Sequence, residues 1–157
     1  MAKPVLRVAA YAVILDAGKI LLARWTGPEG KRWTLPGGGL DHGEDPYHAV
    51  IREVHEETGY HVTVDRLLGI DSHRRPHHPR RRRDRTDFHA LRILYTARIT
   101  GGELRHETGG STDRAEWFDL HRVPGLPRVS VVDAALALHD TRPADGHSTH
   151  TTTGPTT

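Results

Sequence analysis

Three glutamates lie close together in the sequence and are candidates for binding a metal ion. Glu53, Glu56 and Glu57 occupy positions i, i+3 and i+4. On a helix this spacing places them within an arc of roughly 100°, beside the apolar face rather than on it. Carboxylates at this spacing repel one another, and the helix macrodipole disfavours them near a C-terminal end. A hard divalent cation such as Mg²⁺, which prefers carboxylate oxygens, would offset both costs.

The stretch from Pro46 to Thr58 is predicted to form the helix that carries these glutamates. Asp45 can cap its first turn, Pro46 suits the first helical position, and Gly59 suits the position after its end. Apolar residues at helical spacing define its expected buried face: Tyr47, Val50, Ile51, Val54 and Thr58. The glycine-rich turn at residues 36–39 precedes the helix, and a glycine backbone can approach a ligand or a metal closely.

The same stretch resembles the Nudix box of the MutT-like Nudix hydrolases. Five residues separate Gly38 from Glu44, and seven more lead to the run Arg52-Glu53-Val54-His55-Glu56-Glu57-Thr58-Gly59. The fixed positions of the motif are all filled between residues 38 and 60. One departure is Tyr60, which stands where the family usually has a bulky aliphatic residue. This substitution falls at a packing position, so the resemblance remains strong.

The resemblance extends beyond the box. Trp33 to Gly38 is similar to the usual lead-in, and Glu116 to Phe118 is similar to a late strand of such domains. It implies an α+β Nudix fold, with a mixed β-sheet sandwiched between α-helices, in a domain spanning residues 1–140. It also implies hydrolysis of a nucleoside diphosphate linked to another moiety, with Mg²⁺ as the cofactor and Mn²⁺ as the alternative.

The resemblance assigns roles to residues of the box by their position. It implies four catalytic residues: Arg52, Glu53, Glu56 and Glu57. The three glutamates would also be metal ligands, together with the carbonyl of Gly37. Arg52 would orient Glu53 by an ion pair.

Substrate contacts and one further carboxylate are also expected from the resemblance. Glu44 would help to hold the loop and the helix together, and Arg24, Gly38 and Gly39 would contact the substrate. Family members often use an acidic residue from a later loop. Three residues are candidates for it: Glu107, Asp113 and Glu116.

Hydrophobic patterns predict the remaining elements. A second helix is expected at Ser130–His139. Strands are expected at Val5–Leu15, Ile20–Trp25, Val62–Ile70, Phe88–Thr100 and Ala115–Leu120. Residues 141–157 are polar, with no apolar face to bury, so a disordered C-terminal tail is predicted there.

Charge is unevenly distributed along the chain. The formal net charge is +2, from 22 basic and 20 acidic residues. Residues 71–85 alone contain seven arginines and two aspartates, so the rest of the chain is acidic. Such a run is usually a solvated loop, here expected at residues 71–87. It could also attract the 5′ end of an RNA.

Composition excludes several classes of site. The chain contains no cysteine, so thiol nucleophiles and cysteine-bound metals are excluded. A metal site must therefore use oxygen ligands or, less favourably, histidine. No stretch approaches the ~20 apolar residues of a membrane span, and the N-terminus is not a convincing signal peptide. A cytoplasmic location without a membrane partner is expected.

Three functions remain open on the sequence. The leading one is a pyrophosphohydrolase acting on a small nucleotide, either a nucleoside triphosphate or a nucleotide sugar such as ADP-ribose. A non-hydrolytic nucleotide-sensing module is a second, although every carboxylate of the box is present. The third is an RNA 5′-end pyrophosphohydrolase that uses the arginine-rich loop. A monomer and a homodimer are both compatible with the resemblance.

Overall fold

The structure, a computed structural model, describes residues 2–75 and 86–150 of the chain. In chain order the elements are β1 (Lys3–Val13), β2 (Leu15–Asp16), β3 (Lys19–Gly27), β4 (Gly30–Thr34), β5 (Gly37–Gly39), α1 (Pro46–Thr58), β6 (Tyr60–Arg75), β7 (Thr86–Gly102), β8 (Thr112–Asp119), the 3-10 helix η1 (Leu120–Gly125) and α2 (Ser130–Thr141). Among these residues, no helix is long and apolar enough to cross a bilayer.

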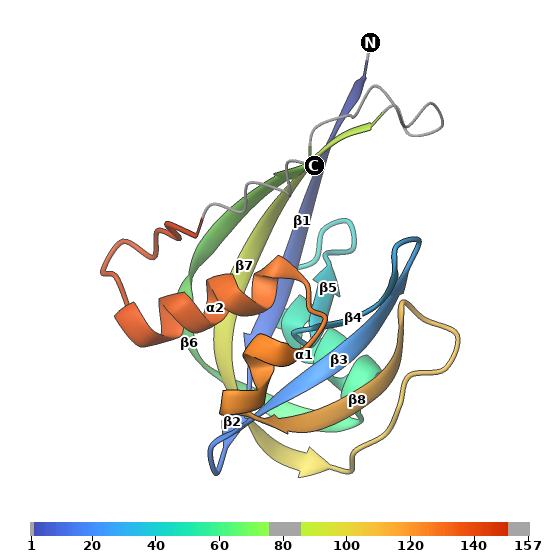
Figure 1. Cartoon of the computed structure of the whole chain (residues 1–157), viewed down its shortest axis with the longest axis vertical. Helices are drawn as coiled ribbons and strands as arrows, with labels where there is room; N and C mark the ends of the chain where they lie inside the picture. The colour runs from blue at the N-terminus through green and yellow to red at the C-terminus, as the bar shows by residue number, and fades with distance from the viewer. Residues whose placement is uncertain (1, 76–85, 151–157) are drawn as a thin grey trace.

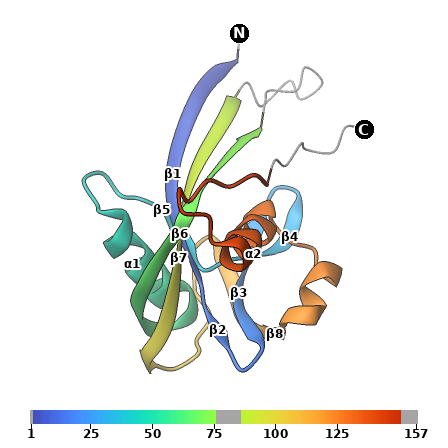
Figure 2. The same cartoon turned by 90° about the vertical axis from the view of Figure 1, so that its left-hand side faces the viewer.

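Two sheets lie between the two α-helices. One sheet has the order β5-β1-β7-β6, and it is mixed because β1 and β7 run parallel while its other pairs are antiparallel. The second contains β2, β3 and β4, with β8 paired to β3. Helices α1 and α2 cover opposite sides of this arrangement (Figures 1 and 2). The expected α+β fold with a mixed sheet between helices is confirmed.

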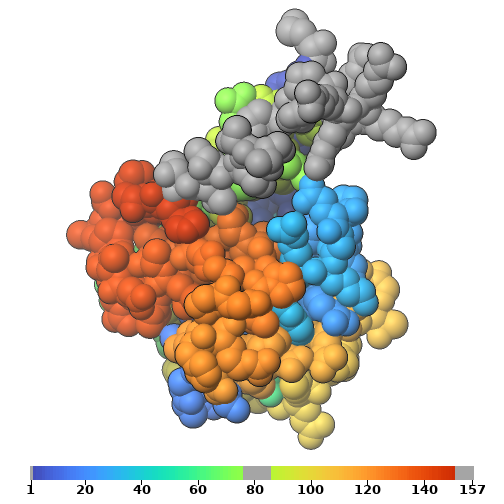
Figure 3. Space-filling model, viewed as in Figure 1, coloured from blue at the N-terminus to red at the C-terminus, as the bar shows by residue number. Residues whose placement is uncertain are grey.

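Each helix packs on its own apolar cluster. Small residues of β1 meet β-branched residues of α1 in a cluster that includes Ala10, Ala12, Val50 and Val54. On the other side, α2 covers a cluster that includes Trp33, Leu94 and Phe118. The space-filling view in Figure 3 shows the chain from β8 through α2 forming much of the face towards the viewer. Apolar residues of the sheets are thus buried in two separate cores, one under each helix.

Helix α1 has the predicted bounds and caps. The Asp45 carboxylate accepts a hydrogen bond from the Tyr47 N–H at 2.7 Å, and Gly59 ends the helix in the left-handed region at φ 79°. The predicted buried face is wrong at Tyr47, whose exposed fraction is 42%, because the small Ala49 takes the place against the sheet. It is also wrong about Glu57, which lies on the buried face at 1% exposure.

The strands on either side of the basic segment are longer than predicted. Residues 71–75 belong to β6 and residues 86–87 to β7, so they are strand rather than loop. These charged residues lie on a ribbon formed by the paired ends of β6 and β7. In such a ribbon every second side chain can point into solvent. Strand β1 extends along the same paired strands, which leaves Leu6 61% exposed. Residues 76–85, which include Arg80–Arg83, lie outside the described residues.

The C-terminal segment 142–150 lies along β6 rather than forming a disordered tail. The Ile70 N–H donates to the Gly146 carbonyl at 2.9 Å, and the Ser148 hydroxyl donates to Asp71 at 2.7 Å. A β-carbon at Gly69 would lie 2.2 Å from the Gly146 oxygen, so a glycine is needed at this contact. Backbone and polar hydrogen bonds order a segment that has little apolar surface. Residues 151–157 lie outside the described residues.

Candidate active site

The most unusual side chain of α1 is the buried carboxylate of Glu57. It accepts a hydrogen bond from the Gly37 N–H at 2.9 Å and contacts no cationic side chain among the described residues. Burial raises the pKa of the Glu57 carboxyl well above its usual range. The Gly37 N–H opposes this change, and the charges of Glu53 and Glu107 add to it. A carboxylate that is buried without a cation is costly, so a role beyond folding is indicated.

Glu53 lies one helical turn before Glu57 and packs against the glycine strand β5. A β-carbon on Gly38 would lie 2.8 Å from the carboxylate atoms of Glu53. Any other residue at this position would therefore force the Glu53 carboxylate to move. Burial raises the pKa of Glu53, and the neighbouring Arg52 lowers it. The glycines of β5 therefore allow two carboxylates of α1 to lie directly against a backbone.

Arg52 connects the loop before α1 to the helix itself. Its guanidinium donates to both oxygens of Glu44 at 2.8 Å, to Glu53 at 3.0 Å, to Glu56 at 3.1 Å and to the Gly39 carbonyl at 3.3 Å. The hydrogen bonds from Arg52 lower the pKa of Glu44 to about 2. The donors of Arg52 are therefore taken up in orienting groups of the protein.

The structure distinguishes between the three late carboxylates. Glu107 accepts hydrogen bonds from the Thr112 N–H at 3.1 Å and the Thr112 hydroxyl at 2.6 Å, both through the same oxygen. Its charge raises the pKa of both Glu53 and Glu57. Of the three candidates, Glu107 is thus the one whose charge is felt by the glutamates of α1, and its role at the site stays a prediction.

The other two candidates are held by arginines of the second sheet. Asp113 receives both Arg24 hydrogen bonds, at 2.9 and 3.1 Å, and a further one from Lys31 at 2.7 Å. Glu116 pairs with Arg114 at 2.9 Å. The guanidinium of Arg24 is therefore occupied, and its role as a substrate contact stays a prediction.

An open hollow of about 340 Å³ lies beside the last turn of α1. It is lined by Glu56, Arg105, His106, Glu107 and Thr108. Sequence patterns do not point to Arg105 or His106, and their position directly before Glu107 is the one signal that could have found them. The hollow brings a carboxylate of the box and the late carboxylate to a single place.

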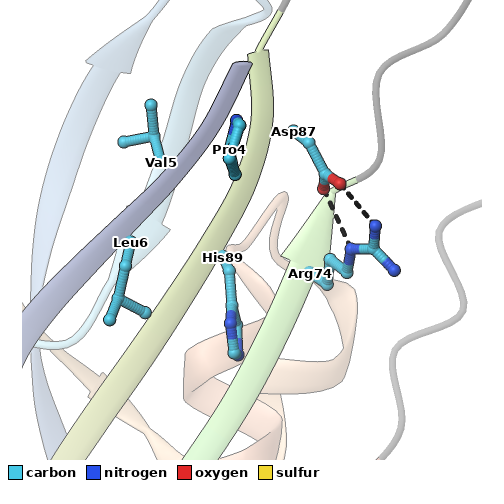
Figure 4. A pocket seen from close by; sticks show the side chains of 6 residues that line it. All are labelled: Pro4, Val5, Leu6, Arg74, Asp87 and His89. Atoms are coloured by element: carbon cyan, nitrogen blue, oxygen red, sulfur yellow. Dashed lines mark hydrogen bonds and ion pairs between the residues drawn. The ribbon is translucent and has the colours of Figure 1, made fainter. Parts of the chain in front are cut away.

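A second hollow, of about 290 Å³, lies on the strand ribbon (Figure 4). Its lining residues are Pro4, Val5, Leu6, Arg74, Asp87 and His89. The Arg74 guanidinium and the Asp87 carboxylate pair with each other through two hydrogen bonds, and His89 bonds Ser72 at 2.7 Å. Its charged groups are thus already partnered, unlike Glu57.

The donor set suits a hard divalent cation. Glu53, Glu56, Glu57 and the Gly37 carbonyl supply only oxygen atoms, and the buried Glu57 carboxylate has no protein cation to balance it. Within residues 2–75 and 86–150, no three acidic or histidine side chains form a compact metal cluster. Arg52 draws Glu53 and Glu56 towards itself. The metal site therefore remains a prediction, for which the residues have the right chemistry.

Replacing Gly38 by alanine should disturb the site without unfolding the chain. The new methyl group would displace the Glu53 carboxylate, and a misplacement of about 1 Å can lower a rate by about 10²-fold. Gly125→Ala, which lies outside the site, is the matched control, since its new methyl group would point into open space. We expect Mg²⁺ affinity in calorimetry and Mg²⁺-dependent turnover to fall only in Gly38→Ala. Equal behaviour of the two variants would contradict the assigned role of Gly38.

Comparisons with known proteins identify the family of the chain. The family model described as NUDIX domain matches residues 5–138. An ADP-ribose pyrophosphatase of Methanocaldococcus jannaschii is 37% identical over 120 residues, which cover 76% of this chain and 65% of that protein. A Bacillus subtilis relative is 32% identical over 124 residues, covering 78% of this chain and 55% of its own length. The chain thus spans less than two thirds of either relative.

A solved structure has the same fold. The NUDIX hydrolase from Nitrosomonas europaea superposes with a TM-score of 0.70 at 23% sequence identity, covering 94% of each chain. At this identity the likeness supports the architecture alone.

Proposed function

The chain belongs to the NUDIX family, and from this premise we propose that it is a metal-dependent pyrophosphohydrolase of small nucleotides. The observation that carries the proposal is Glu57, a buried carboxylate without a protein cation, next to Glu53 and the glycine backbone of β5. A site specialised for Mg²⁺ explains why the fold retains this costly arrangement. Residues 1–140 would form the catalytic domain.

The residues of the chain suggest a division of labour. Glu53, Glu56, Glu57 and the Gly37 carbonyl would hold the divalent cation. When bound, such a cation neutralises phosphate charge and lowers the pKa of water. Arg52 keeps Glu53 in place through its hydrogen bonds to the helix and the loop.

Hydrolysis of a diphosphate adds one water across the P–O–P bridge. The water oxygen forms a bond to one phosphorus, and the bridging oxygen leaves with the other phosphoryl group. The proton released from the water needs a carboxylate acceptor. Glu107 suits this role, since it lines the hollow with Glu56 and one of its oxygens is not used in the hydrogen bonds to Thr112.

We propose a nucleotide sugar of the ADP-ribose type as the first substrate to test, with nucleoside triphosphates next. The relative from Methanocaldococcus jannaschii bears the name ADP-ribose pyrophosphatase, which supports this order. The test incubates the chain with Mg²⁺ and a panel of ADP-ribose, nucleoside triphosphates and 5′-triphosphate RNA, followed by product analysis. We expect a nucleoside monophosphate as one product of a small nucleotide.

The panel can also reject the proposal. Absence of turnover on every compound, with binding that persists in EDTA, would favour the non-hydrolytic sensing module instead. Turnover of RNA alone, with binding that weakens steeply as salt rises, would favour the RNA-end reading. Turnover that continues in EDTA would contradict the role of the metal.

A further inference from the structure

Hydrogen bonds to α1 and β8 hold three consecutive residues of the segment between β7 and β8 in place. The Arg105 N–H donates to the Thr58 carbonyl at the end of α1, at 2.8 Å. The Nδ1 atom of His106 accepts a hydrogen bond from the Ala115 N–H of β8 at 3.0 Å. Glu107, the next residue, accepts two hydrogen bonds from Thr112, the first residue of β8. These contacts fix the backbone of Arg105 and the ring of His106 beside the last turn of α1.

Both residues retain donors that the protein does not use. Among the described residues, the Arg105 guanidinium makes no ion pair, and its side chain is exposed. Because Nδ1 of His106 is an acceptor, the ring carries its proton on Nε2, which remains available as a donor. Both side chains line the hollow that Glu56 and Glu107 share.

The neighbouring arginines cannot supply the same charge without breaking protein contacts. Arg52 is engaged by Glu44, Glu53 and Glu56, and Arg24 is engaged by Asp113. A nucleoside triphosphate carries more negative charge than a single divalent cation neutralises, and carboxylates around the cation offset part of its charge for any diphosphate substrate. The hollow offers an uncommitted guanidinium on the same wall as two carboxylates.

We propose that Arg105 and His106 form an anion subsite for the phosphate group on the far side of the cleaved bond from the nucleoside. This inference rests on the proposed function, and its ligand class is a phosphate monoester or pyrophosphate. A guanidinium presents a fork of donors that matches phosphate oxygens, and the His106 Nε2–H adds one more. The subsite would thus retain the departing phosphate while the carboxylates act on the other side.

The test compares Arg105→Gln with the full-length wild-type chain in Mg²⁺ by isothermal titration calorimetry. The probes are inorganic pyrophosphate and ribose 5-phosphate, the leaving groups of a triphosphate and of ADP-ribose. We expect Arg105→Gln to weaken binding of at least one probe by about tenfold, the loss of a charge-assisted hydrogen bond. Arg66→Gln, an exposed arginine on β6, is the matched control and should bind as wild type. The probe that loses more affinity identifies the source of the phosphate.

The subsite and the proposed function fail separately. If wild type and Arg105→Gln bind both probes equally, or if wild type binds neither, the subsite is rejected even when nucleotides are hydrolysed. If Arg105-dependent binding is found but no nucleotide is turned over, the subsite stands and the pyrophosphohydrolase proposal falls. Circular dichroism checks the fold, and the exposed Arg105 side chain makes a folding defect unexpected.

Discussion

Glu57→Gln should lower turnover by orders of magnitude while leaving the metal-free protein as stable as wild type or more stable. Loss of a carboxylate that holds a cation or moves a proton lowers a rate by about 10²–10⁴-fold. Glutamine has nearly the same shape, and its amide oxygen can still accept the hydrogen bond from Gly37. It removes a buried charge that Glu53 and Glu107 repel. Activity and thermal stability are therefore expected to change in opposite directions.

The pH dependence of this stability gain follows from the raised pKa of Glu57. Near neutral pH the unfolded chain ionises this carboxyl freely, while the folded state resists ionisation, so wild type loses stability that the variant keeps. Below about pH 4, near the usual carboxyl pKa, both states are protonated and the gain should vanish. Melting curves of metal-free protein across this range provide the measurement.

Two controls make the Glu57 result specific. Glu103→Gln changes an exposed carboxylate and should alter neither turnover nor the melting temperature. Addition of Mg²⁺ should raise the melting temperature of wild type by mass action, and should raise that of Glu57→Gln much less. Full activity in Glu57→Gln would refute its role at the site. A lower melting temperature in metal-free buffer would refute the argument from burial.

Local signals explain which parts of the site can be predicted from the sequence. The bounds of α1 follow from Asp45, Pro46 and Gly59, which act within one turn of the helix ends, and the structure confirms them. The burial of Glu57 depends on a different element, the glycine strand β5, which lies against α1 without side chains. Helical periodicity contains no information about the surface that packs against the helix, so it places Glu57 beside the buried face rather than on it.

Long-range pairing decides what local patterns leave open. Asp113 and Arg24 are 89 residues apart in the sequence, yet they form an ion pair. This pair occupies the Asp113 carboxylate and leaves Glu107 as the better candidate for the site. Composition predicts a loop for Asp71 and its neighbours, because charged residues are frequent there. In the structure the same residues continue the pairing of β6 with β7, and the register brings Asp71 opposite Arg92. Charge density alone does not distinguish a solvated loop from a ribbon with paired charges.

Asp71→Asn should destabilise the fold strongly, because it removes one partner of a buried ion pair. Asp71 and Arg92 are 1% and 4% exposed, and two Arg92 nitrogens donate to one Asp71 oxygen at 2.8 and 2.5 Å. Removing one partner of a buried pair costs about 3–5 kcal/mol, because the other charge stays buried. Asp65→Asn is the matched control: its pair with Arg98 is exposed and contributes about 0–1 kcal/mol. Urea unfolding measures both values.

The same pair also fastens two segments that are distant in the sequence. Arg92 donates to the Ser130 hydroxyl at the start of α2 at 3.1 Å, and Asp71 accepts from Ser148 in the C-terminal segment. We therefore expect Asp71→Asn to increase amide exchange at Ile70, whose N–H is bonded to Gly146. Ser148→Ala, which removes a single hydrogen bond, should cost only about 1 kcal/mol. Equal losses in Asp71→Asn and Asp65→Asn would contradict this account. Unchanged exchange at Ile70 would show that the C-terminal segment is held without Asp71.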